Sequence, residues 1–264
     1  MNKSLAYYYD KYRQPFPPEV YDEIIKTFGL TKKSDDVLLN LGYGSNETNF
    51  GLADYFQKIL AWDVDADALE IAAKRRQKLG LKNLFLEQKS EDEIDQLDTK
   101  IKLTIIASSM SSLDGKTIFP KLHAKLKTGG GVAIIKNRAV DIDDSWNFLV
   151  NEERDRIIDK TVRKYIKVKN KELDPTDKIN RADYSSLLSE AGFRSVKQFE
   201  YEKPVLRSAE EVIGWLLSFP EISSDKFGKK LEKFQRDLKA KLETINNSGK
   251  FKENILTTLI VAKK

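Results

Sequence analysis

Two glycines that directly follow a short apolar run are the clearest sign of chemistry in this chain. Residues 37–41 (VLLNL) precede Gly42, Tyr43 and Gly44. A glycine turn between a buried strand and a helix lets the backbone approach a ligand closely, and the helix N-terminus presents free N–H groups. Asp63 stands 21 residues after Gly42, where an acidic side chain can accept hydrogen bonds from ribose hydroxyls. The turn alone is as often a tight loop as a site, but turn and Asp63 together predict a ribose-containing cofactor.

The residues after the turn argue against a dinucleotide. A dinucleotide site places a third glycine where the helix begins and the pyrophosphate binds. Asn46 holds that position here, and Glu47 follows it. The negative charge of Glu47 would repel a pyrophosphate at the helix N-terminus. A cofactor without phosphates avoids this repulsion, so the turn favours S-adenosyl-L-methionine over NAD.

The composition excludes several kinds of active site. The 264 residues include no cysteine and one histidine, His123, which excludes disulfides, thiolate sites, cysteine nucleophiles and multi-histidine metal sites. We therefore expect no metal. No run approaches the length of a membrane span, and the polar N-terminus lacks the apolar segment of a signal peptide. These features predict a soluble, cytoplasmic protein with no membrane span.

The net charge of +5 is unevenly distributed. Residues 154–171 hold 8 basic and 2 acidic side chains, and residues 225–252 hold 9 and 4, so the remainder is acidic. A surplus this small is mild for a nucleic-acid-binding protein, and nucleic acid is not the expected partner. The two basic segments are where an anionic substrate or partner should be sought, although solvated helix faces explain them equally well.

The apolar pattern steps between strand and helix along most of the chain. Helical stripes are predicted at 20–28, 52–59, 69–79, 118–126 and 184–190. Strands are predicted at 37–41, 59–64, 83–87, 103–107, 132–135, 196–201 and 255–261. Alternation at this short spacing is typical of an α/β protein, with a parallel sheet covered by helices on both faces.

Two helical insertions interrupt this alternation. The first carries an amphipathic stripe from Ile157 to Ile166, and the second opens with a capping box formed by Ser208 and Glu211. A long amphipathic helix is predicted at 227–245. The predicted organisation is an N-terminal segment with the core at 1–140, an insertion at 141–180, more core at 181–204, an insertion at 205–250 and a final core strand at 251–264.

In order and spacing, several short segments resemble class I S-adenosylmethionine-dependent methyltransferases. They are 9–17 (YDKYRQPFP), 39–44 (LNLGYG), 61–65 (AWDVD), 89–92 (KSED), 107–114 (ASSMSSLD), 126–132 (LKTGGGV) and 191–193 (AGF). The chain looks like the group that includes small-molecule enzymes such as the trans-aconitate and ubiquinone-pathway methyltransferases. The resemblance implies a Rossmann-like sheet, mostly parallel with the last strand antiparallel, whose helical insertions form a cap over the acceptor.

The resemblance also implies a set of cofactor-binding residues. They are Arg13, Asn40, Gly42, Tyr43, Gly44, Asp63, Val64, Ser90, Glu91 and Ser108. In this reading the turn glycines contact the methionine part, Asp63 binds the ribose and Val64 packs on the adenine. Ser90 or Glu91 reaches the amino edge of the adenine, and Ser108 lines the sulfonium side. Arg13 either pairs with the cofactor carboxylate or is a solvated surface arginine.

Five positions depart from the family pattern. Asn40 replaces an acidic residue, Asn46 the third glycine and Asn49 a threonine, while the pair 111–112 (SS) replaces histidine and tryptophan. Asn40 removes a negative charge near the cationic sulfonium. A charge-assisted hydrogen bond is worth about 1–3 kcal/mol, so affinity for the cofactor would fall about tenfold or more.

Methyl transfer from a sulfonium to a small-molecule acceptor is an in-line displacement that depends mainly on positioning, which supplies about 7–11 kcal/mol. A general base is needed only if the acceptor must lose a proton early, and no catalytic residue is assigned. The candidate substrate-binding residues are Tyr12, Ser109, Ser111 and Trp146. We expect His123 to be structural, because it lies in a helix away from the strand ends.

Two alternatives remain open. An RNA methyltransferase is supported only by the basic insertions, and Ser108-Ser109-Met110 stands where such enzymes on base amino groups carry an acidic-proline-proline motif. A degenerate family member that binds a ligand or partner without catalysis is motivated by Asn40 and Asn46. The identity of the acceptor and the oligomeric state are not predicted.

Overall fold

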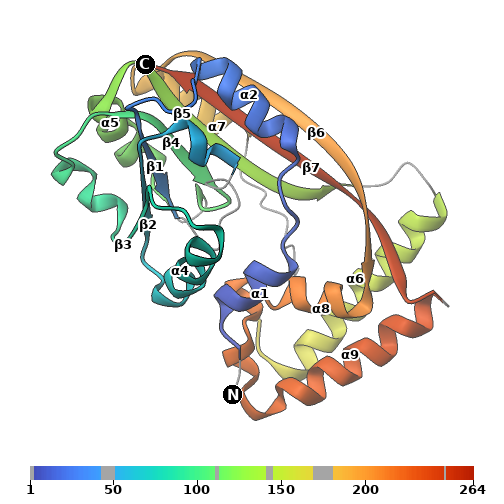
Figure 1. Cartoon of the computed structure of the whole chain (residues 1–264). Coiled ribbons are helices and arrows are strands. Elements are labelled where there is room, and N and C mark those ends of the chain that lie inside the picture. The colour runs from blue at the N-terminus through green and yellow to red at the C-terminus, as the bar shows by residue number, and fades with distance from the viewer. Residues whose placement is uncertain (1–2, 43–50, 111–112, 141–144, 169–180, 247) are drawn as a thin grey trace. The chain divides into compact units, whose positions relative to one another are not determined.

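The computed structural model describes residues 3–42, 51–110, 113–140, 145–168, 181–246 and 248–264. Its centre is a seven-stranded mixed sheet with the order β3-β2-β1-β4-β5-β7-β6 (Figure 1). The last strand of the chain, β7, is antiparallel to the others. The strands are β1 (Val37–Leu41), β2 (Lys58–Asp63), β3 (Leu84–Gln88), β4 (Ile101–Ala107), β5 (Leu126–Val140), β6 (Arg194–Ser208) and β7 (Lys250–Lys263). The predicted Rossmann-like fold class is confirmed.

The chain divides into two compact units. A sheet unit consists of Pro15–Asn137, Lys178–Tyr201 and Thr257–Lys264, and a helical unit consists of Met1–Gln14, Arg138–Asp177 and Glu202–Leu256. Strands β5, β6 and β7 contribute residues to both units. No helix in the described ranges has the length and apolarity that a bilayer crossing requires.

In the sheet unit, parallel pairing of β1 with β2 and β4 aligns the strand ends. Asn40 lies opposite Ala61 on one side and Ile105 on the other. All five residues of β1 are buried, which explains why all but Asn40 are apolar, because a central parallel strand is covered on both faces. The carboxyl ends of β1, β2, β3 and β4 therefore meet at one edge, where ligands bind in open α/β sheets.

Helices cover both faces of this sheet, and each face has its own apolar core. Residues Val20, Ile24 and Phe28 of α2 (Pro18–Phe28) pack with Leu38 and Ile105 on one face, which also receives Ala72 of α4 (Ala66–Leu79). The other face is covered by the short helix η2 (Glu91–Gln96), α5 (Gly115–Lys125) and α7 (Arg181–Glu190). Its core residues include Ile94, Phe119, Leu122, Leu188, Leu39, Ile106 and Ile134.

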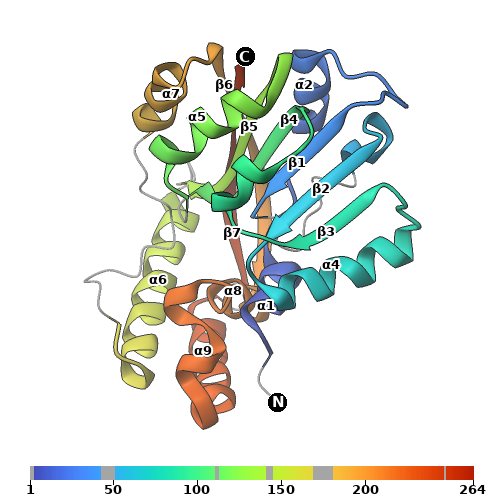
Figure 2. The ribbon, with the colours of Figure 1, turned by 90° about the vertical axis from the view of Figure 1, so that its left-hand side faces the viewer.

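The helical unit has a separate apolar core. Its helices are α1 (Leu5–Tyr12), α6 (Ser145–Tyr165), α8 (Ala209–Leu216) and α9 (Leu231–Ile245), with the short helices η4 (Pro220–Ile222) and η5 (Ser224–Lys230). Helices α6 and α9 lie side by side (Figure 2). The buried set includes Tyr8, Val150, Ile158, Val162, Ile213, Leu217, Phe234, Leu238 and Phe251. The amphipathic stripes of the two insertions therefore bury their apolar faces here.

Several predicted bounds were wrong. The helix predicted at 227–245 begins at Leu231, because Gly228 (φ 51°, ψ −130°) breaks it from η5. The stripe at 52–59 ends in a short helix, η1 (Ala53–Tyr55), before β2 begins. Strands β5, β6 and β7 are longer than predicted. Many of the added residues are polar or exposed to solvent, so a search for apolar runs does not find them.

Candidate functional site

The carboxyl end of β1 touches the loop after β4 at Gly42. Gly42 has a φ of +63°, a conformation that side chains disfavour. A Cβ at this position would approach Cβ and Oγ of Ser109 more closely than van der Waals contact allows. The Ser109 hydroxyl donates a hydrogen bond to the carbonyl oxygen of Leu41 at 3.0 Å. Glycine is therefore required at position 42 both for its backbone angle and for space.

Ser108 fixes the other side of this contact. It follows β4 directly and has a φ of +59°, which costs a residue with a side chain about 1–2 kcal/mol. Its N–H donates to the carbonyl oxygen of Ile135 on β5 at 2.8 Å, so the strained turn is tied to the neighbouring strand. Strain of this kind is typical of functional strand ends. The turn delivers Ser109 to Leu41 and Gly42.

Asp63 ends β2, and its carboxylate is oriented by its own loop. Oδ1 accepts the N–H of Asp65 at 2.9 Å. Asp65 in turn is the N-cap of α4 and accepts the N–H groups of Asp67 and Ala68. The N–H of Lys89, just after β3, donates to the Asp63 carbonyl oxygen at 3.2 Å. The loop geometry thus holds an acidic side chain at the strand edge.

Val64 presents an apolar side chain beside that carboxylate. It is 63% exposed, although the preceding Trp62 is almost fully buried. The indole Nε1 of Trp62 donates to Glu87 Oε2 at 2.9 Å, which anchors β2 to β3. Gln88 Nε2 donates to the Val64 carbonyl oxygen at 3.1 Å and holds the loop from the other side. Val64 is therefore a fixed, uncovered apolar surface.

Ser90 and Glu91 begin η2 after β3. Ser90 is the N-cap and forms a capping box with Glu93, whose Oε1 accepts the Ser90 N–H at 3.2 Å. Ser90 therefore has a structural role, while Glu91 is the first residue of the helix. The acidic first turn, with Glu91, Asp92 and Glu93, would repel phosphates.

The remaining predicted residues of the sheet unit divide into two groups. Asn40 is described and fully buried in β1. Tyr43, Gly44 and Ser111 lie outside the described residues. The structure therefore places Gly42, Ser108 and Ser109 close together at the ends of β1 and β4. Asp63 and Val64 stand at the end of β2, the neighbour of β1.

The predicted residues Arg13 and Tyr12 belong to the helical unit. Arg13 Nε donates to Ser218 Oγ at 3.0 Å, and its guanidinium lies 4.2 Å from the centre of the Phe219 ring. The Tyr12 hydroxyl donates to Glu210 Oε1 at 3.3 Å, and its ring packs against Gly214 of α8. Trp146, the second residue of α6, has its side chain outside the described part of the structure.

His123 packs as a structural residue. Its ring meets Phe193 edge-on at a centroid distance of 5.1 Å. Burial lowers the pKa of His123, and the positive charges of Lys264 and Arg194 lower it further. The residue lies on α5, away from the strand ends that carry Gly42 and Asp63. This placement agrees with the structural role expected from the sequence.

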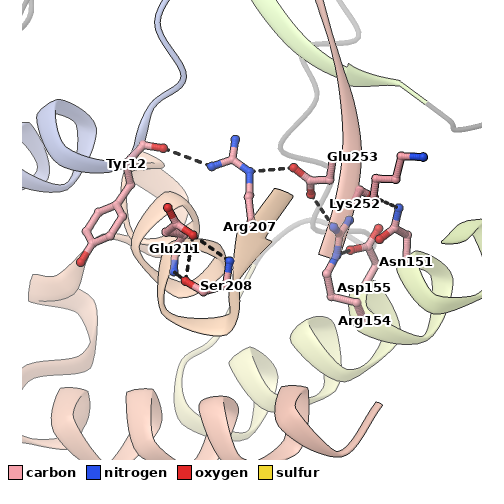
Figure 3. Close-up of polar contacts among 9 residues, drawn as sticks. All are labelled: Tyr12, Asn151, Arg154, Asp155, Arg207, Ser208, Glu211, Lys252 and Glu253. Atoms are coloured by element: carbon pink, nitrogen blue, oxygen red, sulfur yellow. Dashed lines mark hydrogen bonds and ion pairs between the residues drawn. The ribbon is translucent and has the colours of Figure 1, made fainter. Parts of the chain in front are cut away.

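A buried charge network in the helical unit was not predicted from the sequence. Glu253 of β7 accepts hydrogen bonds from Arg154 Nη1 and, through Oε2 at 2.7 Å, from Arg207 Nε (Figure 3). Arg154 Nε also donates to Asp155 at 2.7 Å, and Arg207 Nη1 donates to the Tyr12 carbonyl oxygen at 3.2 Å. Burial disfavours the charged form of Arg154, but Glu253 and Asp155 outweigh it and raise its pKa.

A sequence signal for this network exists. Phe251, Glu253 and Ile255 are the buried phase of β7, whereas Lys250 and Lys252 are exposed. Arg154 likewise falls on the buried stripe of α6, between Val150 and Ile158. A charged residue in the apolar phase of an element indicates a buried partner of opposite charge.

Sequence comparison finds no matching family model and no matching curated protein. Solved structures do match. The chain is similar to a provisionally named type II methyltransferase of Anaeromyxobacter dehalogenans, with a TM-score of 0.59, 14% identity and coverage of 96% of this chain and 97% of that one. It is also similar to a provisionally named sarcosine dimethylglycine methyltransferase of Galdieria sulphuraria, with a TM-score of 0.53, 17% identity and coverage of 94% and 85%.

A third similar structure contains ligands. It is phosphoethanolamine N-methyltransferase 2 of Haemonchus contortus in complex with phosphomonomethylethanolamine and S-adenosylhomocysteine. The TM-score is 0.53 at 15% identity, with coverage of 98% of this chain and 56% of that one. At these identities the similarity establishes the Rossmann-like methyltransferase fold. The finer resemblance to the trans-aconitate and ubiquinone-pathway enzymes stays a prediction.

Proposed function

We propose that this protein is an S-adenosylmethionine-dependent methyltransferase that acts on a small-molecule acceptor. The observation that carries the proposal is the contact between Gly42 and Ser109, at the same strand edge as Asp63. This contact joins Gly42, at the carboxyl end of β1, to the loop after β4, in a sheet with the methyltransferase fold. The exposed Val64 beside Asp63 adds an apolar surface to the edge.

The residues at this edge fit the cofactor. The Asp63 carboxylate, oriented by the Asp65 N–H, suits the hydroxyls of a ribose, and Val64 suits the face of an adenine. The acidic first turn of η2 tolerates an amino group but opposes phosphates, which favours an adenosine without a phosphate chain. When bound, S-adenosylmethionine supplies a methyl group activated by a sulfonium.

The chain's own residues then act mainly by positioning. Gly42 leaves room for Ser109 beside the end of β1, and the strained Ser108 holds the loop that carries Ser109. The Ser109 hydroxyl donates a hydrogen bond to the Leu41 carbonyl oxygen. We therefore assign Ser109 to holding the loop in place and not to acting as a base. A site of this kind suits methyl transfer, in which alignment of the reacting groups supplies much of the acceleration.

A second candidate function is ligand binding without catalysis. Asn40 favours it, because this fully buried position carries a neutral amide where the resemblance implies an acid. The missing charge would weaken attraction for a cationic cofactor without affecting a neutral ligand. S-adenosylhomocysteine lacks the sulfonium charge, so its binding should not be weakened by the neutral amide of Asn40.

Titration calorimetry of the whole chain tests the proposal. We expect binding of both S-adenosylmethionine and S-adenosylhomocysteine, with competition between them. A dissociation constant of about 1 mM corresponds to a binding free energy of only about −4 kcal/mol. If neither compound binds even this weakly, the cofactor assignment is contradicted. Binding without methyl transfer to any of a panel of carboxylate, phosphate and amine metabolites would favour the non-catalytic function.

A further inference from the structure

Helices α6 and α9 of the helical unit meet along a seam at the surface, where they lie side by side (Figure 2). Lys164 of α6 donates a hydrogen bond to Asp237 of α9 at 3.4 Å. Nearly one turn earlier on α6, the Thr161 hydroxyl oxygen accepts a hydrogen bond from Lys241, one turn later on α9, at 3.0 Å. The two helices are therefore antiparallel, and these contacts fix their register. All four residues belong to the helical unit.

Cations line both sides of this seam. Residues four apart on a helix lie on the same face, so Lys160 of α6 stands beside Lys164. On α9, Lys233 and Lys241 stand one turn before and one turn after Asp237 for the same reason. Lys160, Lys164 and Lys233 are exposed, whereas Lys241 is half-buried. The seam thus presents two rows of positive charge to solvent.

The carboxylate of Asp237 does not cancel this charge. The Tyr165 hydroxyl donates a hydrogen bond to it, and Lys164 donates a second one. The hydrogen bond from Tyr165, and then the contact with Lys164 and the positive charge of Lys233, hold the pKa of Asp237 below its ordinary value. Asp237 is therefore ionised and already has its own cation.

Other carboxylates of the two helices are paired within the unit as well. The ion pairs are Glu153–Arg156, Asp159–Arg163, Asp237–Lys164 and Glu243–Lys239. Among the residues that the structure describes, several exposed cations of α6, η5 and α9, or just beyond their ends, form no ion pair with a carboxylate. They are Lys160, Lys167, Lys229, Lys230, Lys233 and Arg236. The surface therefore carries a surplus of uncompensated positive charge.

The extent of this surface suits a chain of phosphates better than a single anion. From Lys230 to Lys241 the chain advances about 16 Å along the helix axis. A nucleic-acid strand carries a phosphate about every 3.4 Å, so this length matches about four or five phosphates. The net charge of +5 does not reveal such a surface, because acidic residues elsewhere offset it.

The seam lacks the apolar side chains that a membrane-binding helix inserts into lipid. The large apolar residues of α9 pack into the core of the helical unit, and none of them is exposed. The exposed Phe148 and Leu149 lie on α6, but they precede Lys160 by about 16 Å along the helix. The charge on the seam therefore has no apolar partner surface, which favours a polyanion in water over a lipid bilayer.

We propose that the seam surface, formed by Lys160, Lys230, Lys233, Arg236 and Lys241, binds the phosphate backbone of a nucleic acid. Lysine and arginine contacts with phosphates position a nucleic acid without reading its sequence, so the binding is not sequence-specific. The inference goes beyond the proposed methyltransferase function. Nucleic acid is a binding partner here and is not assigned as the methyl acceptor.

The test uses the whole protein and a fluorescein-labelled single-stranded RNA of about 20 uridines, which exceeds the usual binding site of one small domain. Fluorescence anisotropy measures affinity at several salt concentrations. We expect a dissociation constant of about 10⁻⁶–10⁻⁴ M at physiological salt. With about four phosphates bound, the slope of log affinity against log salt should be about −2.8, so affinity should fall about fiftyfold between about 50 and 200 mM salt.

The triple variant Lys160→Gln/Lys230→Gln/Lys233→Gln removes three of the exposed cations that form no ion pair. It should fold as the wild type does, which urea unfolding verifies, because no described carboxylate loses a partner. We expect it to bind the RNA at least about tenfold more weakly and to reduce the magnitude of the salt slope by about 2. Both changes follow from the loss of phosphate contacts.

A matched control separates this surface from total charge. Lys78→Gln/Lys82→Gln/Lys116→Gln removes three exposed lysines of the sheet unit and changes the net charge by the same amount. It should keep most of the affinity and the wild-type salt slope. Equal losses in the two triple variants would overturn the proposal, as would a wild-type salt slope near zero.

Two further outcomes decide between partners. If the wild type does not bind the RNA at about 50 mM salt, where phosphate contacts are strongest, the proposal is overturned. Vesicles of phosphatidylcholine and phosphatidylserine are tested in parallel, and binding to the vesicles without binding to the RNA would assign the seam to a membrane surface instead. S-adenosylhomocysteine takes no part in these measurements, so this inference and the proposed function can fail separately.

Discussion

Gly42 and Ser109 contact each other so closely that no side chain larger than hydrogen fits at position 42. Ser109 is held in place by its hydrogen bond to the Leu41 carbonyl oxygen, and Gly42 by the end of β1. The contact joins two strands that are adjacent in the sheet but distant in sequence. It therefore couples the shape of the proposed cofactor turn to the loop after β4.

Gly42→Ala is expected to weaken cofactor binding and to destabilise the fold. The added Cβ must displace Ser109, and the left-handed backbone adds about 1–2 kcal/mol of strain. Calorimetry with S-adenosylhomocysteine should show at least a tenfold loss of affinity, which corresponds to about 1.4 kcal/mol. Gly80→Ala is the matched control, because Gly80 has a φ of +65° but nothing near its Cβ position. Equal affinities in the two variants would contradict the assignment.

Asp63→Ala should weaken S-adenosylhomocysteine binding by at least about tenfold, because the ribose hydroxyls would lose a charged acceptor. Asp63→Asn should lose less, since an amide oxygen still accepts hydrogen bonds. Calorimetry on both variants measures the difference. Asp67→Ala removes a nearby carboxylate at the start of α4 and should bind normally. An unchanged affinity in Asp63→Ala would show that the ribose is placed wrongly.

His123 predicts a pH dependence of stability. Burial, Lys264 and Arg194 hold its pKa below the ordinary value of 6.5. A lowered pKa in the folded state means that the unfolded chain binds the proton more readily, so acid favours unfolding. The contribution of neutral His123 is complete above pH 6.5 and is lost as the pH falls through the folded pKa.

The measurement is the free energy of unfolding in urea at several values between about pH 7.5 and 5. The wild type should lose more stability over this range than His123→Gln, which has no titrating imidazole. His123 is the only histidine in the chain, so the difference between the two curves isolates its titration. Parallel curves would mean that His123 titrates equally in both states.

The strand ends could be predicted from sequence better than the contacts between them. The run 37–41, apolar except for Asn40, matches β1, because a central strand covered on both faces is mostly apolar. The capping box of Ser208 and Glu211 is also confirmed, since capping depends on residues three apart. The contact of Gly42 with Ser109 could not be predicted, because it depends on the register of two distant segments.

The long strands show the same limit in a different way. The residues added to β6 and β7 include several charged side chains, and an apolar-run criterion ends the strand where the charges begin. Glu253 was missed for this reason, although its position two residues from Phe251 marks it as buried. The apolar stripe continues on both sides of Gly228, so the periodicity predicts a helix across it, where the structure has a break. A break in the backbone of a helix does not change the spacing of the apolar residues in the sequence, so this spacing cannot reveal it.

Removing the carboxylate of the buried network should cost more than removing one of its arginines. Glu253→Gln leaves two buried guanidinium groups without their shared counter-ion, and uncompensated buried charge costs about 3–5 kcal/mol. Arg154→Met leaves Glu253 paired with Arg207, so the remaining charges stay balanced and the loss should be smaller. Urea unfolding of both variants measures the difference in the free energy of unfolding. Arg156 is an exposed arginine close to Arg154 on α6. The free energy of unfolding of Arg156→Met should be within about 0.5 kcal/mol of that of the wild type. If Glu253→Gln were as stable as Arg156→Met, Glu253 could not be the group that neutralises and orients the two arginines.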